Sequence, residues 1–228
     1  MITKTTMSTT TTTASDTLTV HNNCLCIPTD VTIETDVMRL FATVKERFGR
    51  LDLLFNNAGI NSTAASIEQV SLHDFERVLA TNVTGPFLCA REAIKIMSSS
   101  SQEQVPCGGR IINNGSLSSH IPRPHSTTYT TSKHALSGLT KCIALDGRKY
   151  NIACGQVDFG NIVTELSINT NRPNVGALQA DGSTTLIEPS MNVHDAAETI
   201  YTMANLPLEA NILQMTVMAT AMPFVGRG

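Results

Sequence analysis

Long hydrophobic runs are missing from the sequence, and no apolar stretch approaches the ~20 residues that a helix needs to cross a bilayer. An excess of basic residues is missing too, since 16 lysines and arginines stand against 19 aspartates and glutamates, a net charge of -3. Nucleic acids and anionic lipid surfaces bind strongly basic proteins, so neither a nucleic-acid nor a membrane partner is expected. With 41% hydrophobic and 15% charged residues, the 228-residue composition is typical of one globular domain with a substantial core.

Cysteine and histidine patterns that would bind a metal are absent. The six cysteines include no C-x-x-C pair and follow no signal peptide, and the six histidines have no metal-ligand spacing. No metal ion is therefore predicted. Reduced and mostly buried thiols are favoured over a disulfide framework, which indicates a reducing compartment and predicts a cytoplasmic protein. The cysteines are Cys24, Cys26, Cys89, Cys107, Cys142 and Cys154.

Glycine is absent from the chain before Gly49, and the beginning of the chain is rich in threonine instead. Ten of the first twenty residues are threonine, with an unbroken run from Thr9 to Thr13. A transit peptide would carry arginines, and none occurs before Arg39. We expect residues 1–20 to form a low-complexity segment, poorly ordered or structured only by docking, and residues 21–228 to form the domain.

From Cys24 onward, strand-like and helix-like segments alternate, which predicts an α/β fold with a parallel sheet covered by helices on both faces. Five strands are expected, within residues 25–30, 51–55, 110–114, 151–159 and 212–218, the last of them buried. Helices are expected at residues 36–48, 72–80, 82–97, 129–150 and 193–205. Gly49 ends the first helix, and Ser71 with Asp74 forms a capping-box pattern at the second. Residues 165–190, rich in Asn, Thr, Gly and Pro, are typical of a mobile flap over a site.

A tyrosine and a lysine in the stretch Tyr-Thr-Thr-Ser-Lys at 129–133 lie four positions apart, on one face of a predicted helix. An ammonium beside a phenol favours the phenolate, so Lys133 is expected to lower the pKa of Tyr129 from its usual value near 10. Such a tyrosine can give a proton to a carbonyl oxygen or take one from an alcohol. Ser116 lies thirteen residues earlier, at the end of a predicted strand, where its hydroxyl could bind the same oxygen. The tyrosine and lysine alone are a weak signal, because helices carry such pairs by chance.

Further matches make the sequence resemble the short-chain dehydrogenase/reductase family. They are the N-N-A-G turn at 56–59, Asn82 in T-N-V-T-G, the strand G-R-I-I-N-N-G-S ending at Ser116, and D-V-T at 30–32. These motifs occur in the family's order, and the resemblance covers residues 24–228. It implies a Rossmann-like doubly wound parallel sheet.

The resemblance also implies roles for individual residues. Tyr129 would be the acid/base, Lys133 would tune it and bind the nicotinamide ribose, Ser116 would hold the substrate oxygen, and Asn82 would order a proton-relay water. Further contacts with NAD or NADP would come from Asp30 at the adenine, Asn57, Arg91, Ile162 at the carboxamide, and Thr164 at a phosphate or the carboxamide. Phe159 stands where the family usually has proline.

One part of the family's pattern is missing. Members open with a T-G-x-x-x-G-I-G-type loop, because only backbone without side chains can approach the pyrophosphate at a helix N-terminus. No such glycine loop precedes Gly49, and no G-x-G-x-x-G occurs later. We therefore expect a fold that lacks the first β-α-β unit, with an unpaired sheet edge and weak nucleotide binding. Two interpretations fit, a truncated reductase or a protein that uses the site without conventional cofactor binding, and the intact site favours the first.

The functional hypothesis is an NAD(P)-dependent oxidoreductase that interconverts an alcohol and a ketone or aldehyde, with a small-molecule substrate set by residues 117–126 and 165–190. One alternative is a cofactor-independent isomerase, lyase or dehydratase that uses the same tyrosine. Another is a non-catalytic, degenerate subunit of a heteromer. A homodimer or homotetramer is expected through the helices around 82–97 and 129–150, which the family commonly pairs and which carry apolar stripes. The stripes are Val83, Phe87, Ala90 and Ile94 on one helix and Ala135, Leu139 and Cys142 on the other.

Overall fold

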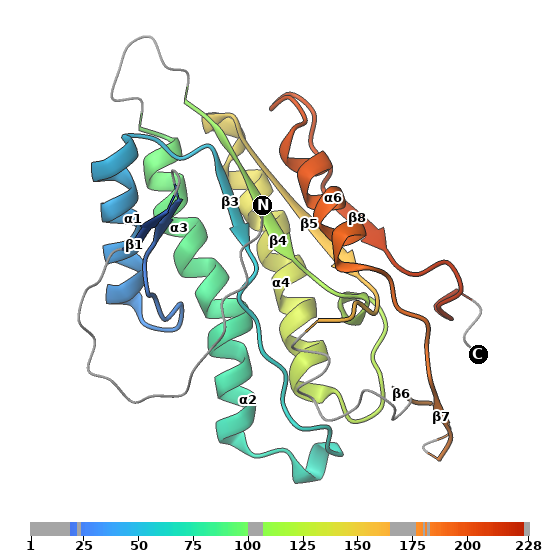
Figure 1. The fold of residues 1–228 in the computed structure, drawn as a ribbon. Coiled ribbons are helices and arrows are strands. Elements are labelled where there is room, and N and C mark those ends of the chain that lie inside the picture. Colours follow the sequence, from blue (N-terminus) through green and yellow to red (C-terminus); the bar gives the residue numbers. More distant parts are fainter. Residues whose placement is uncertain are drawn as a thin grey trace.

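The centre of the fold is a parallel sheet of four strands in the order β3-β4-β5-β8 (Figure 1). The computed structural model describes residues 19–21, 24–99, 107–164, 177–179, 181 and 183–225. All three strand pairings are parallel, which confirms the predicted α/β class. The strands span Leu53–Asn56 (β3), Gly109–Asn114 (β4), Ile152–Phe159 (β5) and Gln214–Val217 (β8).

Helices cover both faces of this sheet (Figure 1). Helices α3 and α4 pack on one face and α6 packs on the other, because alternate residues of a strand point to opposite sides. Thus Ile111 of β4 joins the cluster with α3 and α4, while its neighbour Ile112 packs with Met203 of α6. The helices span Glu34–Phe48 (α1), Leu72–Leu79 (α2), Gly85–Met97 (α3), Thr127–Asp146 (α4) and Val193–Ala204 (α6).

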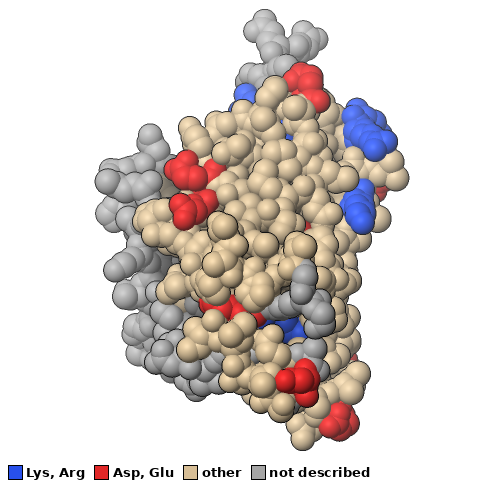
Figure 2. Space-filling model, turned by 90° about the vertical axis from the view of Figure 1, so that its right-hand side faces the viewer, with Lys and Arg blue, Asp and Glu red and all other residues tan. Residues whose placement is uncertain are grey.

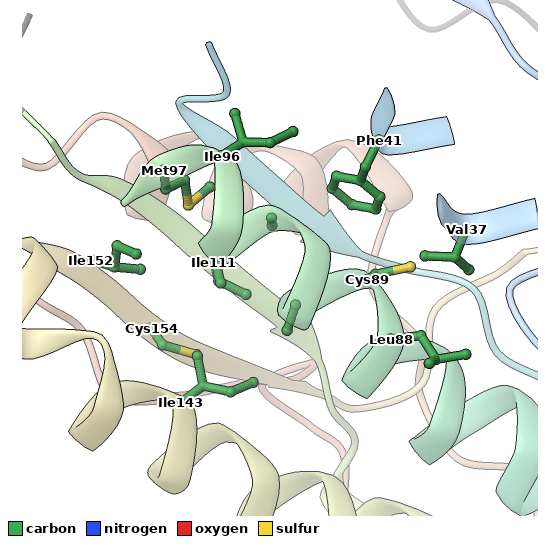
Figure 3. Close-up of a cluster of buried hydrophobic side chains, with 12 residues drawn as sticks. Val37, Phe41, Leu88, Cys89, Ile96, Met97, Ile111, Ile143, Ile152 and Cys154 are labelled. Carbon is green, nitrogen blue, oxygen red and sulfur yellow. The ribbon is translucent and has the colours of Figure 1, made fainter. Parts of the chain in front are cut away.

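The larger hydrophobic core lies between the sheet, α3, α4 and α1 (Figure 3). Ile111 and Cys154 project from β4 and β5 toward Met97 of α3 and Ile143 of α4, and Val37 brings α1 against α3. Fully burying one such aliphatic side chain contributes roughly 1.5–3 kcal/mol. This core fixes the C-terminal half of α4 against the sheet through Ile143, and the same helix carries Tyr129 and Lys133 in its first half.

The helix ends follow local sequence signals. Gly49 ends α1 in the left-handed conformation (φ 70) and donates its N–H to the Lys45 carbonyl. The Ser71 hydroxyl accepts from the Asp74 N–H at 3.0 Å at the start of α2. Both expected signals are confirmed, since each depends only on neighbouring residues.

The predicted count of five strands in one parallel sheet is wrong. The strand β2 (Cys24–Cys26) instead pairs antiparallel with β1 (Thr19–His21) in a separate two-stranded ribbon. Within the described residues β2 pairs with β1 alone and takes no place in the main sheet. Among the described residues β3 is therefore one edge of that sheet, as expected. The predicted burial of the last strand is also wrong, since β8 is the other edge and its residues alternate between exposed and half-buried.

The predicted flap contains a short antiparallel hairpin of β6 (Ala177–Leu178) and β7 (Thr185–Leu186). Residues 165–176 of the flap, and residues 1–18 of the predicted threonine-rich segment, lie outside the described residues. All six cysteines are free, but Cys24, Cys26 and Cys142 are exposed, so the expectation of mostly buried thiols is wrong. Two of these are on β2 and one is on α4.

Three further features concern membrane-spanning helices, surface charge and metal-binding groups. No helix among them is long and apolar enough to cross a membrane. On the face shown in Figure 2, charged side chains are scattered around a broad area of other residues and do not gather into a patch of one sign. Searched over the same residues, His, Cys, Asp and Glu side chains form no group of three or more that could hold a metal ion.

Candidate active site

Ser116 follows β4 directly and begins the 3-10 turn Leu117–Ser119 (η3). Its Oγ accepts a hydrogen bond from the Ser118 N–H at 3.2 Å, and its own N–H donates to the Ser119 Oγ at 3.3 Å. This reciprocal capping box fixes the backbone at the carboxyl end of the strand. Because the Ser116 oxygen accepts from the turn, its hydroxyl proton can be donated outward, toward Tyr129 or a substrate oxygen.

Tyr129 and Lys133 lie one turn apart on α4, as the spacing predicts. The Lys133 Nζ lies 5.4 Å from the centroid of the Tyr129 ring and donates to the Asn114 carbonyl at 2.7 Å. Tyr129 is half-buried and Lys133 is only 6% exposed. Helix α4 therefore places a phenol and an ammonium beside the carboxyl end of β4, where Ser116 also lies.

Burial decides the protonation of the pair. It raises the pKa of Tyr129, which the Ser116 hydroxyl opposes by hydrogen bonding to the phenol and which Asp158 reinforces by its charge. It lowers the pKa of Lys133 to about 8, against the opposing charge of Asp158. The expectation that the pKa of Tyr129 is lowered is thus wrong for this state of the site, because loss of water around the phenolate outweighs its neighbours. Near neutral pH Tyr129 is therefore a protonated phenol beside the Lys133 ammonium. The phenol can donate its proton.

Asn82 joins the turn after β3 to helix α4. It lies in a π-helical turn, Ala80–Thr84, and is 1% exposed. Its Nδ2 donates to the Ile60 carbonyl at 2.9 Å and to the Ser132 Oγ at 3.0 Å, and its Oδ1 accepts from the Ile60 N–H at 2.9 Å. The sequence predicted a helix break near this position but not the π-turn, a feature that is frequent at functional sites. Asn82 thereby holds the backbone beside Lys133.

Three of the residues expected to meet a nicotinamide cofactor lie at the carboxyl ends of the strands. Asn57 follows β3 and accepts at Oδ1 from the Asn114 Nδ2 at 2.8 Å, next to the carbonyl that binds Lys133. Ile162 and Thr164 follow β5, and Ile162 bridges to Met191. In a parallel sheet these ends share one edge, where ligands bind in doubly wound folds. The structure thus brings this group to the side of the sheet that carries Lys133.

Asp30 and Arg91 lie around α1 instead. The Asp30 Oδ1 accepts from the Thr32 N–H and Oγ1 at 2.9 and 2.8 Å, just before α1. Arg91 of α3 pairs with Glu34 at 2.7 Å and with Glu92 at 2.9 Å. No hydrogen bond or ion pair within the described ranges joins either side chain to Tyr129 or Lys133.

The described residues fit one end of a nicotinamide dinucleotide better than the other. Lys133 has one hydrogen bond, to Asn114, and an ammonium has three donors, so it can still bind ribose hydroxyls. A diphosphate needs a helix N-terminus that backbone can approach without side chains. The described helix nearest the start, α1, has Ile33 as its N-cap and Glu34 and Asp36 in its first turn, and these carboxylates repel phosphate. The nicotinamide end fits, and no diphosphate cradle occurs among these residues.

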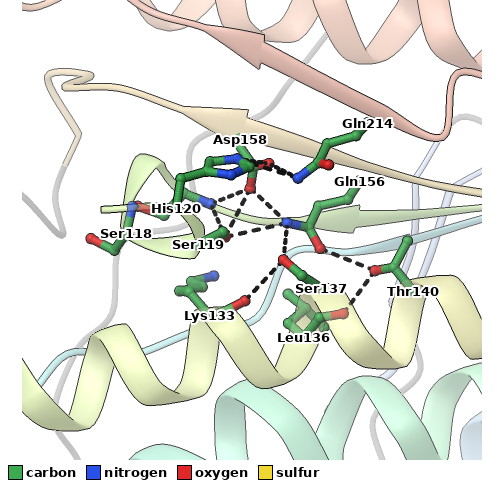
Figure 4. Close-up of polar contacts among 11 residues, drawn as sticks. Ser118, Ser119, His120, Lys133, Leu136, Ser137, Thr140, Gln156, Asp158 and Gln214 are labelled. Carbon is green, nitrogen blue, oxygen red and sulfur yellow. Dashed lines mark hydrogen bonds and ion pairs between the residues drawn. The ribbon is translucent and has the colours of Figure 1, made fainter. Parts of the chain in front are cut away.

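A buried polar network behind Ser116 was missed by the sequence reasoning (Figure 4). It centres on Asp158 of β5, which is fully buried, and includes His120, Gln156 and Gln214. The signal was present, since a carboxylate and an amide within the predicted buried strand 151–159 require partners. Which partners they find depends on the packing of η3 and β8 against β5.

A parallel α/β sheet with a serine, a tyrosine and a lysine at its carboxyl edge defines a Rossmann-like domain whose site is suited to proton transfer at a substrate oxygen. The family model of the short chain dehydrogenases matches residues 2–174. The chain therefore belongs to the short-chain dehydrogenase/reductase family.

Individual relatives agree with this assignment. The chain is 36% identical over 128 residues to the 3beta-hydroxysteroid dehydrogenase of Mediterraneibacter gnavus, which covers 56% of this chain and 44% of that protein. It is 34% identical over 146 residues to glucose 1-dehydrogenase 2 of Bacillus subtilis, covering 64% and 55%. The chain thus spans about half the length of these curated relatives. The solved structure of ElxO with NADP bound is 30% identical, with a TM-score of 0.65 over 82% of this chain and 74% of that one.

Proposed function

We propose that this chain acts as an NAD(P)-dependent oxidoreductase that interconverts an alcohol and a ketone or aldehyde. The observation that carries the proposal is the half-buried Tyr129 with the buried Lys133, beside Ser116 at the carboxyl edge of the sheet. ElxO, whose solved structure is 30% identical to this chain with a TM-score of 0.65, has NADP bound. Family membership and this geometry support redox chemistry over the cofactor-independent alternatives.

Ser116, Tyr129 and Lys133 have different roles at the substrate oxygen. In the reducing direction Ser116 donates a hydrogen bond that holds the carbonyl oxygen, and the Tyr129 phenol gives that oxygen a proton. Lys133, with its pKa of about 8, stays largely protonated at neutral pH and stabilises the phenolate that forms. Asn82 holds α4 beside Lys133 through its hydrogen bond to the Ser132 Oγ. The nicotinamide, when bound, supplies or accepts the hydride, and Lys133, Asn57, Ile162 and Thr164 would hold its nicotinamide end.

The test replaces only the proton donor. Tyr129→Phe should lower redox turnover by about 10²- to 10⁴-fold, the usual contribution of a general acid, without changing the fold. A hydroxysteroid and an aldose, the substrate types named by two relatives, serve as probes, and nicotinamide absorbance follows turnover. Tyr150→Phe is the matched control, because Tyr150 packs against the hydrophobic core after α4. Turnover retained within a few-fold in Tyr129→Phe would remove this tyrosine from the mechanism.

We also propose a location and an assembly for the protein, which its surface features support. Free thiols, three of them exposed, persist in a reducing compartment, so we place the protein in the cytoplasm. The outer faces of α3 and α4 expose Phe87 and Leu145 at 46% and 60%, which supports association of two or more copies through these helices. Ala90, part of the predicted stripe, lies in the core and is not available.

A further inference from the structure

Asp158 is a fully buried carboxylate on β5, directly behind the residue expected to bind the substrate oxygen. Its Oδ1 accepts from the Ser119 Oγ at 2.9 Å and from the Gln156 Nε2 at 2.7 Å (Figure 4). The same oxygen accepts from the Ser116 N–H at 2.9 Å. Two of these donors belong to the turn that carries Ser116. The carboxylate is therefore the anchor of that turn against the sheet.

The second oxygen of Asp158 faces the outer edge of the sheet. Its Oδ2 accepts from the Gln214 Nε2 at 3.0 Å and shares a hydrogen bond of 2.9 Å with the His120 Nε2, whose role as donor depends on the tautomer of the ring. The Ser116 N–H and the side-chain amides of Gln156 and Gln214 can only donate here, and a carboxylate, which only accepts, matches them. Asp158 thus holds a negative charge inside the protein, with its nearest donors supplied by the turn, β5 and β8.

Gly115 makes this close approach possible. A Cβ atom at position 115 would overlap the Asp158 Oδ1 and crowd the Gln156 side chain. The carboxylate therefore packs directly on the backbone that leads into Ser116. Ser116 and Asp158 are held as one unit, and a change of charge at Asp158 acts at short range on the site.

We propose that Asp158 is a positioning residue of this site, whose buried negative charge and hydrogen bond to the Ser116 N–H hold the turn and keep Tyr129 and Lys133 protonated. The titratable groups that face it are Tyr129 and Lys133 from α4 and His120 from the end of the turn. From β8 it meets the neutral amide of Gln214. The roles of Ser116 and Tyr129 in this inference rest on the proposed function, whereas the electrostatic coupling does not.

The sign of the coupling follows from the charge. A carboxylate nearby favours an ammonium and disfavours a phenolate, so Asp158 raises the pKa of Lys133 and of Tyr129. At Lys133 this opposes the lowering caused by burial. Without the charge, the ammonium would be lost at a lower pH.

The test measures this ionisation without nucleotide or substrate. The protein is labelled with ¹³C at lysine Cε and titrated by NMR between neutral and mildly alkaline pH, with the Lys133 resonance assigned from its loss in Lys133→Met. In Asp158→Asn the Lys133 midpoint should fall by roughly half to one pH unit, since one neighbouring charge has been removed. The other lysines are internal standards and should not move. Asp146→Asn, which removes an exposed carboxylate from the same helix, should leave the Lys133 midpoint unchanged.

A second variant guards against misfolding of the first. Gln214→Arg keeps a donor to the Asp158 Oδ2 from an exposed position and neutralises the charge in place, so it should shift the midpoint in the same direction. An unchanged Lys133 midpoint in every variant that folds overturns the proposal, whatever turnover does. Where redox turnover is measurable, Asp158→Asn should lower kcat more than it raises KM, the pattern of a lost transition-state contact. A chain with shifted ionisation but no redox activity would overturn the proposed function alone.

Discussion

The Lys133 ammonium donates a hydrogen bond to the Asn114 carbonyl at 2.7 Å and so ties helix α4 to the carboxyl end of β4. The ammonium of Lys133 is almost completely buried. Among the described residues its hydrogen-bond partner is a neutral carbonyl. Burying the charge therefore has a cost in stability that the catalytic role has to outweigh.

Replacement of this lysine should stabilise the fold at neutral pH. The pKa of Lys133 falls from 10.5 to about 8 on folding, so the unfolded chain binds more protons between these values. The stability of the protein should accordingly rise with pH across that window, as far as Lys133 contributes. We expect Lys133→Met to gain on the order of 2–3 kcal/mol at pH about 7 and much less near pH 10, because each pKa unit corresponds to about 1.4 kcal/mol.

The measurement is urea unfolding of both proteins at the two pH values. Burial raises the pKa of the Cys89 and Cys154 thiols to about 11 and about 12, which lowers stability as the pH rises past the ordinary thiol value. These effects cancel in the difference between variant and parent. Lys141→Met, an exposed change on the same helix, is the control. A difference that does not depend on pH would contradict the assignment of the shift to Lys133.

The ion pair between Arg123 and Glu188 should contribute to the free energy of unfolding. The two nitrogens of the guanidinium contact the two carboxylate oxygens at 3.0 and 2.5 Å, with side-chain exposures of 26% and 1%. Arg123→Ala leaves Glu188 buried with the Asn161 Nδ2 as a neutral donor. We expect a loss on the order of 2–3 kcal/mol, below that of a fully buried pair because Arg123 keeps some water. Chemical denaturation measures it.

A surface pair provides the comparison. Arg77 contacts Asp74 at 3.3 Å with both side chains more than 40% exposed, so Arg77→Ala should cost about 1 kcal/mol or less. Replacing both Arg123 and Glu188 by Met should recover part of the loss, since neither charge then has to be buried. Equal losses for Arg123→Ala and Arg77→Ala would show that burial does not strengthen the first pair.

The 228-residue chain should bind NAD and NADP weakly by itself. Lys133, Asn57 and Thr164 can contact the nicotinamide end, but each neutral hydrogen bond contributes only ~0.5–1.5 kcal/mol. The first turn of α1 carries Glu34 and Asp36, which disfavour a diphosphate. Calorimetry with both nucleotides tests this, with ElxO as the positive control. A micromolar dissociation constant would show that residues outside the described ranges, or a second copy, complete the site.

A charged residue at Phe87 should disrupt the association of two copies of the chain through α3 and α4. Light scattering at micromolar concentration should give a mass of at least two chains of 24.5 kDa. Phe87→Glu should shift the protein toward one chain, because Phe87 on α3 is 46% exposed. Phe48→Glu at the end of α1, where the ring is 57% exposed, should leave the mass unchanged. A parent protein of single-chain mass would reject the interface.

The helices and the Ser–Tyr–Lys site could be predicted from the sequence because their signals are local. Apolar spacing, Gly49 and the Ser71 cap set the helix ends within a few residues, and the four-residue step from Tyr129 to Lys133 required only the helical period. The positions of Ser116 and Asn57 after their strands followed from the order in which the family's motifs occur along the sequence. These parts of the structure depend on neighbours along the chain.

Other features were decided by packing between distant segments. Whether β2 pairs with β1 or with the main sheet depends on which edge is within reach, and the π-turn at Asn82 depends on Ile60 and Ser132. The protonation of Tyr129 likewise depends on how far α4 is covered by its surroundings rather than on Lys133 alone. The sequence by itself determined which side chains are candidates for proton transfer. Only the tertiary structure decided their pKa values and the partners of Asp158, because desolvation and hydrogen bonding arise from atoms that are far apart in the chain.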